Sequence, residues 1–351
     1  MSKLVKLSTK PTLHGTGLVA LDIVISANPD EPIYQWAGGT CGNVLTILSY
    51  LGWNSFPVSR LKIDEPSSQV VQRDMKKWKV RLDYTDMEPS ASVPVITQEI
   101  SIGKSGLPKH KFHWRNCPKC GSYLPNYSPV TLKATQQVKE QVKASDLYFF
   151  DRVSPGALDL ARHFKSLGAI VFFEPSAKGN PKHFEEAIKL ADIVKYSDQR
   201  FSSVITDGIK KHRPILEIQT LGENGLRYRT KKQVTWAELP AFETEDVKDT
   251  CGCGDWTTAG IIDSLCRDGR TALMKHGAEH LKQGLRYGQA LGAWNCSFEG
   301  ARSGMYAVTK PAFKKEITSI LDESTQKTRT MSTKAKFENV SDGLCPACPH
   351  N

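Results

Sequence analysis

With 351 residues, 39% of them hydrophobic and 24% charged, the chain can bury a large core without a disulfide or a metal, and no segment approaches the roughly 18 apolar residues of a membrane span. The polar N-terminus lacks the apolar centre of a secretory signal, so we expect a cytoplasmic protein. Lys and Arg outnumber Asp and Glu by 47 to 37, but the basic residues are dispersed and do not alternate with aromatic ones, which argues against a nucleic-acid partner.

Short apolar runs bounded by turn residues predict strands that are buried on both faces. They cover residues 18–24, 147–150, 170–173, 193–196 and 216–219. Helical patterns lie between several of them, at residues 44–51, at 157–167 before Gly168, and at 184–191 after Pro181. This alternation predicts an α/β fold with a mostly parallel central sheet and helices on both faces.

Residues 93–127 interrupt the alternation. Two β-like runs, 93–102 and 111–115, flank a turn rich in Gly, Pro and Lys, and a pair of cysteines follows. We interpret this segment as an inserted β lobe. The predicted organisation is therefore a core in two parts, residues 1–92 and 128–323, the inserted lobe 93–127, and a tail 324–351 that begins as a polar, flexible linker.

The strongest chemical signal is the run Asp249-Thr250-Cys251-Gly252-Cys253-Gly254-Asp255, which precedes a helical pattern. Its glycines allow close approach of the backbone to a ligand, and the N-terminus of the following helix attracts an anion such as phosphate. A carboxylate on that rim can accept a proton from an attacking hydroxyl. Taken alone, the run is as consistent with a structural turn as with a site.

This run resembles the Asp-Thr-x-Gly-x-Gly-Asp signature of the ribokinase-like (PfkB) carbohydrate kinase family. The resemblance implies the three-layer sandwich of that family, in which the inserted lobe acts as a lid. It also implies that Asp255 is the catalytic base and that Gly252, Cys253 and Gly254 form the anion hole. Cys253 stands where the family has a small residue such as Ala. A monovalent cation, K⁺, is implied at Asp249 and Cys251.

A second match is Gly38-Gly39-Thr40-Cys41-Gly42-Asn43, which resembles the family's Gly-Gly-x-x-x-Asn segment. The resemblance implies that Gly38, Gly39 and Asn43 line the site of the phosphate acceptor. It also implies that Asp22 holds substrate hydroxyls, because a carboxylate can accept two hydroxyl hydrogen bonds. The alternative for Asp22 is a turn residue at the end of a strand.

Segments that resemble the nucleotide site follow in the family's order. They imply ATP contacts at Lys195, Ser197, Thr220, Gly222, Gly225 and Asn295. The family's Asn-x-x-Glu motif, which organises Mg²⁺, is replaced by Ser197-Asp198-Gln199-Arg200. Asp198 is the candidate substitute, since a cation at Arg200 repels Mg²⁺.

Nine cysteines, an odd number without a secretion signal, argue against a disulfide framework. Cys117 and Cys120 form one Cys-x-x-Cys pair, and Cys345 and Cys348 form another at the end of the chain. Four thiolates make a tetrahedral set for a structural zinc ion that would pin the tail to the lid. Two unrelated redox or surface pairs are the alternative. His110 and His113 are interpreted as packed or surface residues.

The sequence thus predicts an ATP- and Mg²⁺-dependent kinase for a sugar, a nucleoside or a related polyol, with a homodimer through the lid as one form of assembly. The alternative is a zinc protein that keeps the kinase fold as a binding or regulatory module with reduced activity. Arg200 and Cys253 favour this alternative, whereas the intact Asp255 and its flanking glycines favour the enzyme.

Overall fold

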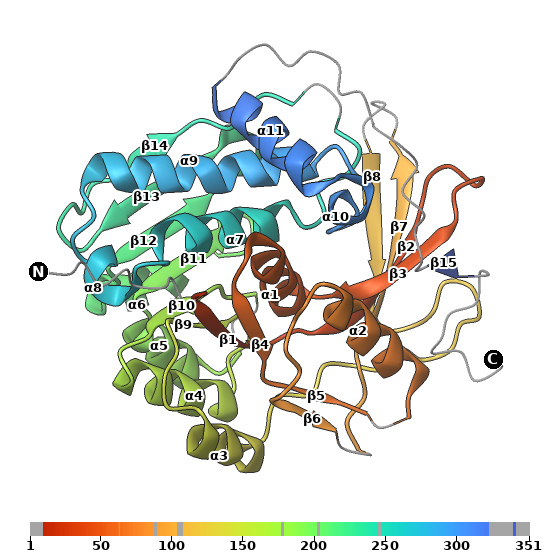
Figure 1. Ribbon diagram of the computed structural model, residues 1–351, viewed down its shortest axis with the longest axis horizontal. Coiled ribbons are helices and arrows are strands. Elements are labelled where there is room, and N and C mark those ends of the chain that lie inside the picture. The colour runs from red at the N-terminus through yellow and green to blue at the C-terminus, as the bar shows by residue number, and fades with distance from the viewer. Residues whose placement is uncertain are drawn as a thin grey trace, which may run out of the picture.

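The computed structural model describes residues 10–62, 64–87, 90–103, 108–176, 179–201, 204–244, 247–322 and 340–341. Its centre is a sheet of eight strands in the order β14-β13-β12-β11-β10-β9-β1-β4 (Figure 1). Strand β13 is antiparallel to both neighbours, and the other pairs are parallel. The strands are β1 (Thr12–Thr16), β4 (Asn54–Pro57), β9 (Leu147–Phe150), β10 (Ile170–Phe173), β11 (Ile193–Ser197), β12 (Leu216–Thr220), β13 (Leu226–Thr230) and β14 (Ala237–Leu239).

Helices cover both faces of this sheet, as the alternation of strands and helices predicts. One face packs against α1 (Thr40–Leu51), α2 (Pro66–Lys77), α7 (Cys253–Leu265), α8 (Gly269–Leu273), α9 (Ala278–Asn295), α10 (Gly304–Ala307) and α11 (Lys310–Leu321). The other packs against α3 (Leu132–Gln141), α4 (Pro155–Ser166), α5 (Pro181–Leu190) and α6 (Val204–Lys211). Successive strand residues alternate between the two cores, so that Phe149 and Phe172 enter the first and Phe150 and Phe173 the second.

Local signals explain the helix ends. Ser154 caps α4 by accepting a hydrogen bond of 3.1 Å from the backbone of Ala157, with Pro155 in the first turn. After α4, Gly168 adopts a φ of 86°, which confirms the predicted glycine stop. Asn180 caps α5 in the same way, with Pro181 at its first position.

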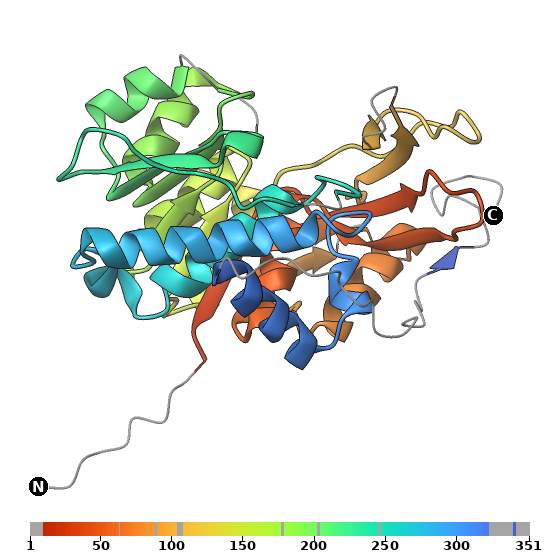
Figure 2. The same ribbon diagram turned by 90° about the horizontal axis from the view of Figure 1, so that it is seen from above.

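A second sheet, which we call the lid sheet, extends beyond the core helices on one side (Figure 2). Its order is β15-β3-β2-β7-β8, and its strands are β2 (Ala20–Ile25), β3 (Ile33–Gly38), β7 (Val95–Ile102), β8 (Pro108–His113) and β15 (Val340–Ser341). Two short strands, β5 (Ser59–Leu61) and β6 (Thr85–Met87), form a separate parallel pair.

The lid sheet corrects two sequence expectations. The run 18–24 is not a core strand, because β2 lies between β3 and β7 in the lid sheet. The lid is therefore not confined to residues 93–127 but also takes in β2 and β3 from the first part of the chain. Most residues of β2 are buried, so its sequence has the apolar pattern of a core strand. The first core strand is instead β1, which contains Thr, His and Gly and therefore lacks a continuous apolar run.

The predicted linker 324–342 lies outside the described residues, except for residues 340–341. Val340 and Ser341 pair with Tyr34 and Ile33 at the edge of β3. Within the described ranges, none of the helices combines the length and the apolar character that crossing a membrane requires.

Candidate active site

The glycine-rich loop turns directly into α7. Gly252 caps this helix with a φ of 76°, and a Cβ at that position would lie 2.5 Å from Cα of Ala301. Only glycine fits this turn against the neighbouring segment. The first amides of α7 have no acceptor within the helix, and the helix dipole favours an anion at this end. The arrangement suits phosphate at the loop formed by Gly252, Cys253 and Gly254, which we call the anion loop.

Asp249 organises the loop from beneath. Its Oδ1 accepts a hydrogen bond of 2.9 Å from the backbone of Cys251, and its Oδ2 accepts one of 2.8 Å from the backbone of Gly300. The lid also reaches it, because Gln98 Nε2 donates to Oδ2 at 2.5 Å and His110 Nδ1 lies 3.4 Å from Oδ1. The sequence reasoning missed Gln98 and the role of His110, which link the lid to the loop.

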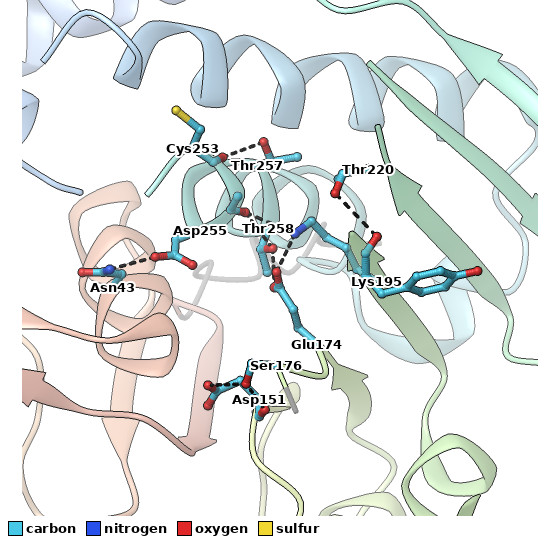
Figure 3. Close-up of polar contacts among 12 residues, drawn as sticks. Asn43, Asp151, Glu174, Ser176, Lys195, Thr220, Cys253, Asp255, Thr257 and Thr258 are labelled. Atoms are coloured by element: carbon cyan, nitrogen blue, oxygen red, sulfur yellow. Dashed lines mark hydrogen bonds and ion pairs between the residues drawn. The ribbon is translucent and has the colours of Figure 1, made fainter. Parts of the chain in front are cut away.

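Asp255 is the third residue of α7 and faces α1 (Figure 3). Asn43 Nδ2 donates a hydrogen bond of 2.7 Å to Asp255 Oδ2. Burial raises the pKa of Asp255 to about 7; the charge of Glu174 also raises it, while the Asn43 hydrogen bond and the charge of Lys195 lower it. A carboxyl with this pKa exchanges protons near neutral pH, as a general base must.

Lys195 lies on β11 behind the loop and is 2% exposed. Its Nζ pairs with Glu174 Oε1 at 2.6 Å and donates to the carbonyl of Gly254 at 3.3 Å. Glu174 Oε2 accepts a hydrogen bond of 2.5 Å from Thr258 Oγ1, one turn along α7 from Asp255 (Figure 3). The structure thus brings the predicted ATP contact Lys195 to the anion loop.

Two carboxylates at this edge of the core sheet were missed in the sequence. Glu174 follows β10, and Asp151 follows β9. Asp151 is 1% exposed, and its Oδ1 accepts a hydrogen bond of 2.9 Å from the backbone of Leu18 while its Oδ2 pairs with Arg152 at 2.8 Å. An acidic residue directly after a buried strand is the signal that could have identified both, because ligands bind at the carboxyl ends of parallel strands.

The predicted acceptor residues lie together. Asp22 is inside β2, not after a strand, and its carboxyl group lies over Gly38, where a Cβ would be 1.9 Å from it. Burial raises the pKa of Asp22 to about 6, whereas the charge of Arg302 and a hydrogen bond from the backbone of Gly39 lower it. Gly39 has a φ of 74° and precedes α1, the helix that carries Asn43.

The predicted nucleotide residues are at the ends of β11 and β12. Ser197 pairs with Thr220 in the sheet, and the turn after Thr220 closes through a 2.8 Å hydrogen bond from Leu221 to Gly225. Gly222 and Gly225 adopt φ values of 61° and 93° there. Asn295 lies elsewhere: it is fully buried, and its Nδ2 donates to the carbonyl of Cys251 at 2.8 Å. It supports the anion loop, and its predicted contact with ATP stays a prediction.

Asp198, the candidate magnesium ligand, is exposed, and its Oδ1 accepts a hydrogen bond of 2.8 Å from the backbone of Gln199. Glu174 contacts α7 through Thr258, and the charges of Glu174 and Asp151 both act on Asp255. Among the residues that the structure describes, no group of three or more His, Cys, Asp or Glu side chains is arranged to hold a metal. Mg²⁺ does not require one, since it commonly binds through one or two carboxylates together with substrate phosphates.

Cys117 and Cys120 lie on a tight turn after the lid strand β8. The backbone of Cys117 donates to Ser122 at 2.9 Å, that of Gly121 donates to Cys117 at 2.9 Å, and Gly121 has a φ of 75°. Cys117 is buried and Cys120 exposed. Cys345 and Cys348 lie outside the described residues. His113 Nε2 pairs with Glu99 at 2.6 Å, and His110 Nδ1 lies 3.4 Å from Asp249 Oδ1.

Comparison with known proteins finds kinases among the relatives of this chain. No family model matches the chain. An ATP-dependent ribose-1-phosphate kinase of Halopiger xanaduensis is 28% identical over 166 residues, which cover 46% of this chain and 51% of that relative. The chain thus matches about half the length of this curated relative.

Solved structures match over most of the chain. A fructokinase from Xylella fastidiosa with bound ATP has a TM-score of 0.67 at 17% identity and covers 90% of this chain and 99% of its own. A nucleoside kinase from Methanocaldococcus jannaschii, described as an archaeal member of the ribokinase family, has a TM-score of 0.62 at 17% identity and covers 89% of this chain and 98% of its own. The protein therefore has the ribokinase-like α/β fold, and it resembles the sugar and nucleoside kinases of the ribokinase (PfkB) family.

Proposed function

We propose that the protein is an ATP-dependent kinase that transfers the γ-phosphoryl group to a hydroxyl of a sugar, a nucleoside or a related polyol. The observation that carries this proposal is the placement of Asp255. It is a half-buried carboxylate with a pKa near neutrality, three residues into a helix whose N-terminal amides and glycine turn suit an anion.

In this mechanism Asp22 holds hydroxyls of the acceptor, and Asp255 removes the proton of the attacking hydroxyl. The amides at Gly252, Cys253 and Gly254 stabilise the charge that develops on the transferred group. The proton of the acceptor hydroxyl moves to a carboxylate oxygen of Asp255 as the new O–P bond forms and the bond between the γ-phosphorus and the oxygen of ADP breaks.

Lys195 and Glu174 support the same loop from behind. The Lys195 ammonium is held between Glu174 and the carbonyl of Gly254, which fixes the first turn of α7. Asp198 stays the proposed carboxylate for Mg²⁺, because Glu174 already pairs with Lys195 and Asp151 with Arg152. The bound ion would neutralise phosphate charge. The predicted K⁺ site at Asp249 and Cys251 stays a prediction, since both oxygens of Asp249 accept hydrogen bonds from protein donors.

The ATP contacts proposed at Ser197, Thr220, Gly222 and Gly225 follow from their position at the carboxyl ends of β11 and β12. The acceptor class is tested by measuring ADP release with neutral sugars, nucleosides and ribose 1-phosphate, the last suggested by the name of the Halopiger relative. ADP release that depends on one acceptor class, and that Asp255→Asn abolishes, is the expected result. No acceptor-dependent release from any class would refute the kinase and leave the binding-module alternative.

We also propose the structural zinc ion at Cys117, Cys120, Cys345 and Cys348. The turn at Cys117, with Gly121 in the left-handed region, supports it. The pairing of Val340 and Ser341 with β3 brings the chain to the lid sheet only four residues before Cys345. A closed set of four thiolates would hold the tail without catalysing a reaction.

A homodimer through the lid is the proposed assembly. In the described part of the lid sheet β8 is an edge strand, and Ile102 and Trp114 near it are 63% and 52% exposed. An exposed edge strand and apolar side chains suit pairing with a second copy. Light scattering at several protein concentrations would test it, and a monomer at every concentration would refute it.

A further inference from the structure

Arg302 is a buried cation beneath the candidate active site. The side chain is fully buried, and the sequence reasoning attached no role to it. Arginine stays charged in proteins, so a buried guanidinium must be satisfied by acceptors close to it. Its NH2 pairs with Asp74 Oδ2 at 2.8 Å and also donates to the carbonyl of Ala37, one residue before Gly38.

The same side chain fixes the orientation of Asn43. Arg302 Nε donates a hydrogen bond of 3.0 Å to Oδ1 of Asn43. Because a guanidinium only donates, the atom of Asn43 that faces it must be the amide oxygen. The amide nitrogen then necessarily faces the other way, where it donates to Asp255 Oδ2 at 2.7 Å. Reversing this amide would place a donor against a donor on one side and two acceptors against each other on the other.

The segment that carries Arg302 also contacts the other parts of the site. Gly300 donates its backbone N–H to Asp249 Oδ2 at 2.8 Å, and the carbonyl of Ala301 accepts a hydrogen bond of 3.0 Å from Trp256 Nε1. Three consecutive residues thus touch the base of the anion loop, the helix that carries Asp255, and Asn43.

We propose that Arg302 is a positioning residue, which directs the Asn43 amide nitrogen at Asp255 and places its positive charge at Ala37, next to Gly38 and the Asp22 carboxyl group that lies over it. The inference rests on the proposed kinase function. Two effects are expected from one side chain: a geometric effect on the base through Asn43, and an electrostatic effect on the acceptor carboxylate.

Several charged groups other than Arg302 act on Asp255 and Asp22, so the test must distinguish the effect of Arg302 from theirs. Asp255 is influenced by Glu174 and Asp151, which follow two core strands, and by Lys195. Arg302 is influenced by Asp74 on α2, by Asp22 on β2 and by Tyr306 on α10, whose hydroxyl donates to Asp74 Oδ1 at 2.5 Å. Of the cations among these groups, Arg302 alone contacts Asn43 in the described structure.

Two variants separate geometry from charge. Arg302→Lys keeps a positive charge but loses the planar fork that reaches Asn43, Asp74 and Ala37 together. For this variant we expect a kcat about tenfold lower and an acceptor KM close to that of the wild type. The pair Arg302→Met with Asp74→Asn removes both charges and avoids leaving a buried carboxylate unpaired. For this pair we expect the same loss of kcat together with an acceptor KM about 10-fold or more higher.

The pH profile is the readout that a structural role alone would not move. The acid limb of kcat should shift by about one unit toward higher pH in the charge-free pair, because Asp255 loses an oriented donor. The matched control is Arg270→Met, which breaks the 3.0 Å pair with Asp192 at the start of β11, the opposite end of the strand from the anion loop. It should change thermal stability and leave the pH profile in place.

The possible outcomes can be distinguished. If the wild type shows no acceptor-dependent ADP release, or Asp255→Asn keeps its turnover, the kinase proposal fails. If those two behave as expected but folded Arg302→Lys and the charge-free pair both retain the wild-type kcat, acceptor KM and pH profile, the kinase stands and the positioning role of Arg302 is refuted.

Discussion

Asn43 donates a hydrogen bond of 2.7 Å to Asp255, although 212 positions separate the two residues in the sequence. The bond joins the helix after the Gly-Gly turn to the helix after the anion loop. It therefore ties the candidate acceptor site to the candidate base, and it is the contact on which the following expectations depend.

Asp255→Asn should reduce turnover by about 10² to 10⁴, because the amide cannot accept the proton of the attacking hydroxyl. Steady-state ADP release with the identified acceptor is the measurement. Asp263→Asn, the same change on the same helix, is the control, since Asp263 bonds to Trp53 and Arg267 away from the loop. Equal activity of both variants would contradict the assignment.

The wild-type kcat should rise with pH and level off above neutrality. Only the ionised form of Asp255 can act as a base, and its pKa is raised to about 7. A profile that stays flat from pH 5 to 8, with ATP and acceptor saturating, would show that another group accepts the proton.

The substitution Asp255→Asn should stabilise the fold at alkaline pH. The folded protein holds the Asp255 proton to about pH 7, whereas the unfolded chain releases it near 3.8, so the free energy of unfolding falls as pH rises between these values. Asp255→Asn removes this loss, which is on the order of 1.4 kcal/mol per unit of pKa shift. Thermal melts at pH 8 should therefore show a higher Tm for the variant, and melts at pH 4 a smaller difference.

Asp22→Ala should raise the acceptor KM strongly and the ATP KM weakly. Losing charge-assisted hydrogen bonds costs about 1.5 to 3 kcal/mol, or 10- to 150-fold. Asp30→Ala, in the exposed turn between β2 and β3, provides the control. Unchanged acceptor kinetics in Asp22→Ala would return this residue to a structural role.

Zinc analysis tests the proposed metal site. The purified protein should contain one zinc per chain, and Cys345→Ser or Cys117→Ser should lower the content sharply because each removes one of four thiolates. Cys296→Ser, outside the proposed set, should keep the metal. If the wild-type protein contains no zinc when it is expressed in medium with adequate zinc, the proposed zinc site is refuted.

A mild thiol oxidant such as diamide should reduce activity through Cys253 and Cys296, whose sulfur atoms are 3.0 Å apart at the anion loop. Joining the two sulfurs would rearrange the first turn of α7, with the two protons and two electrons passing to diamide. Cys296→Ser should resist the loss, and peptide mapping would identify the bond. Equal inactivation of both proteins would assign the effect to other thiols.

The local sequence was sufficient for those parts of the protein that depend on near neighbours. Strands β9 and β10 match their predicted bounds, and β11 and β12 match to within a residue, because each is a short apolar run between clear turn signals. The turn of the anion loop could also be predicted from the sequence, since glycines before an apolar helix favour a turn at the N-terminus of that helix.

The tertiary structure decided which segments meet. β2 resembles a core strand in its apolar pattern, but its partners β3 and β7 place it in the lid, and strand pairing between distant segments leaves no local signal. Glu174, Gln98 and Arg302 became part of the site only when the chain brought them to Lys195, Asp249 and Asn43. Local patterns fix backbone conformation, whereas the burial, charge and hydrogen bonds that set the pKa of Asp255 come from residues far away in the sequence, such as Asn43, 212 positions away, and only the packed fold brings them together.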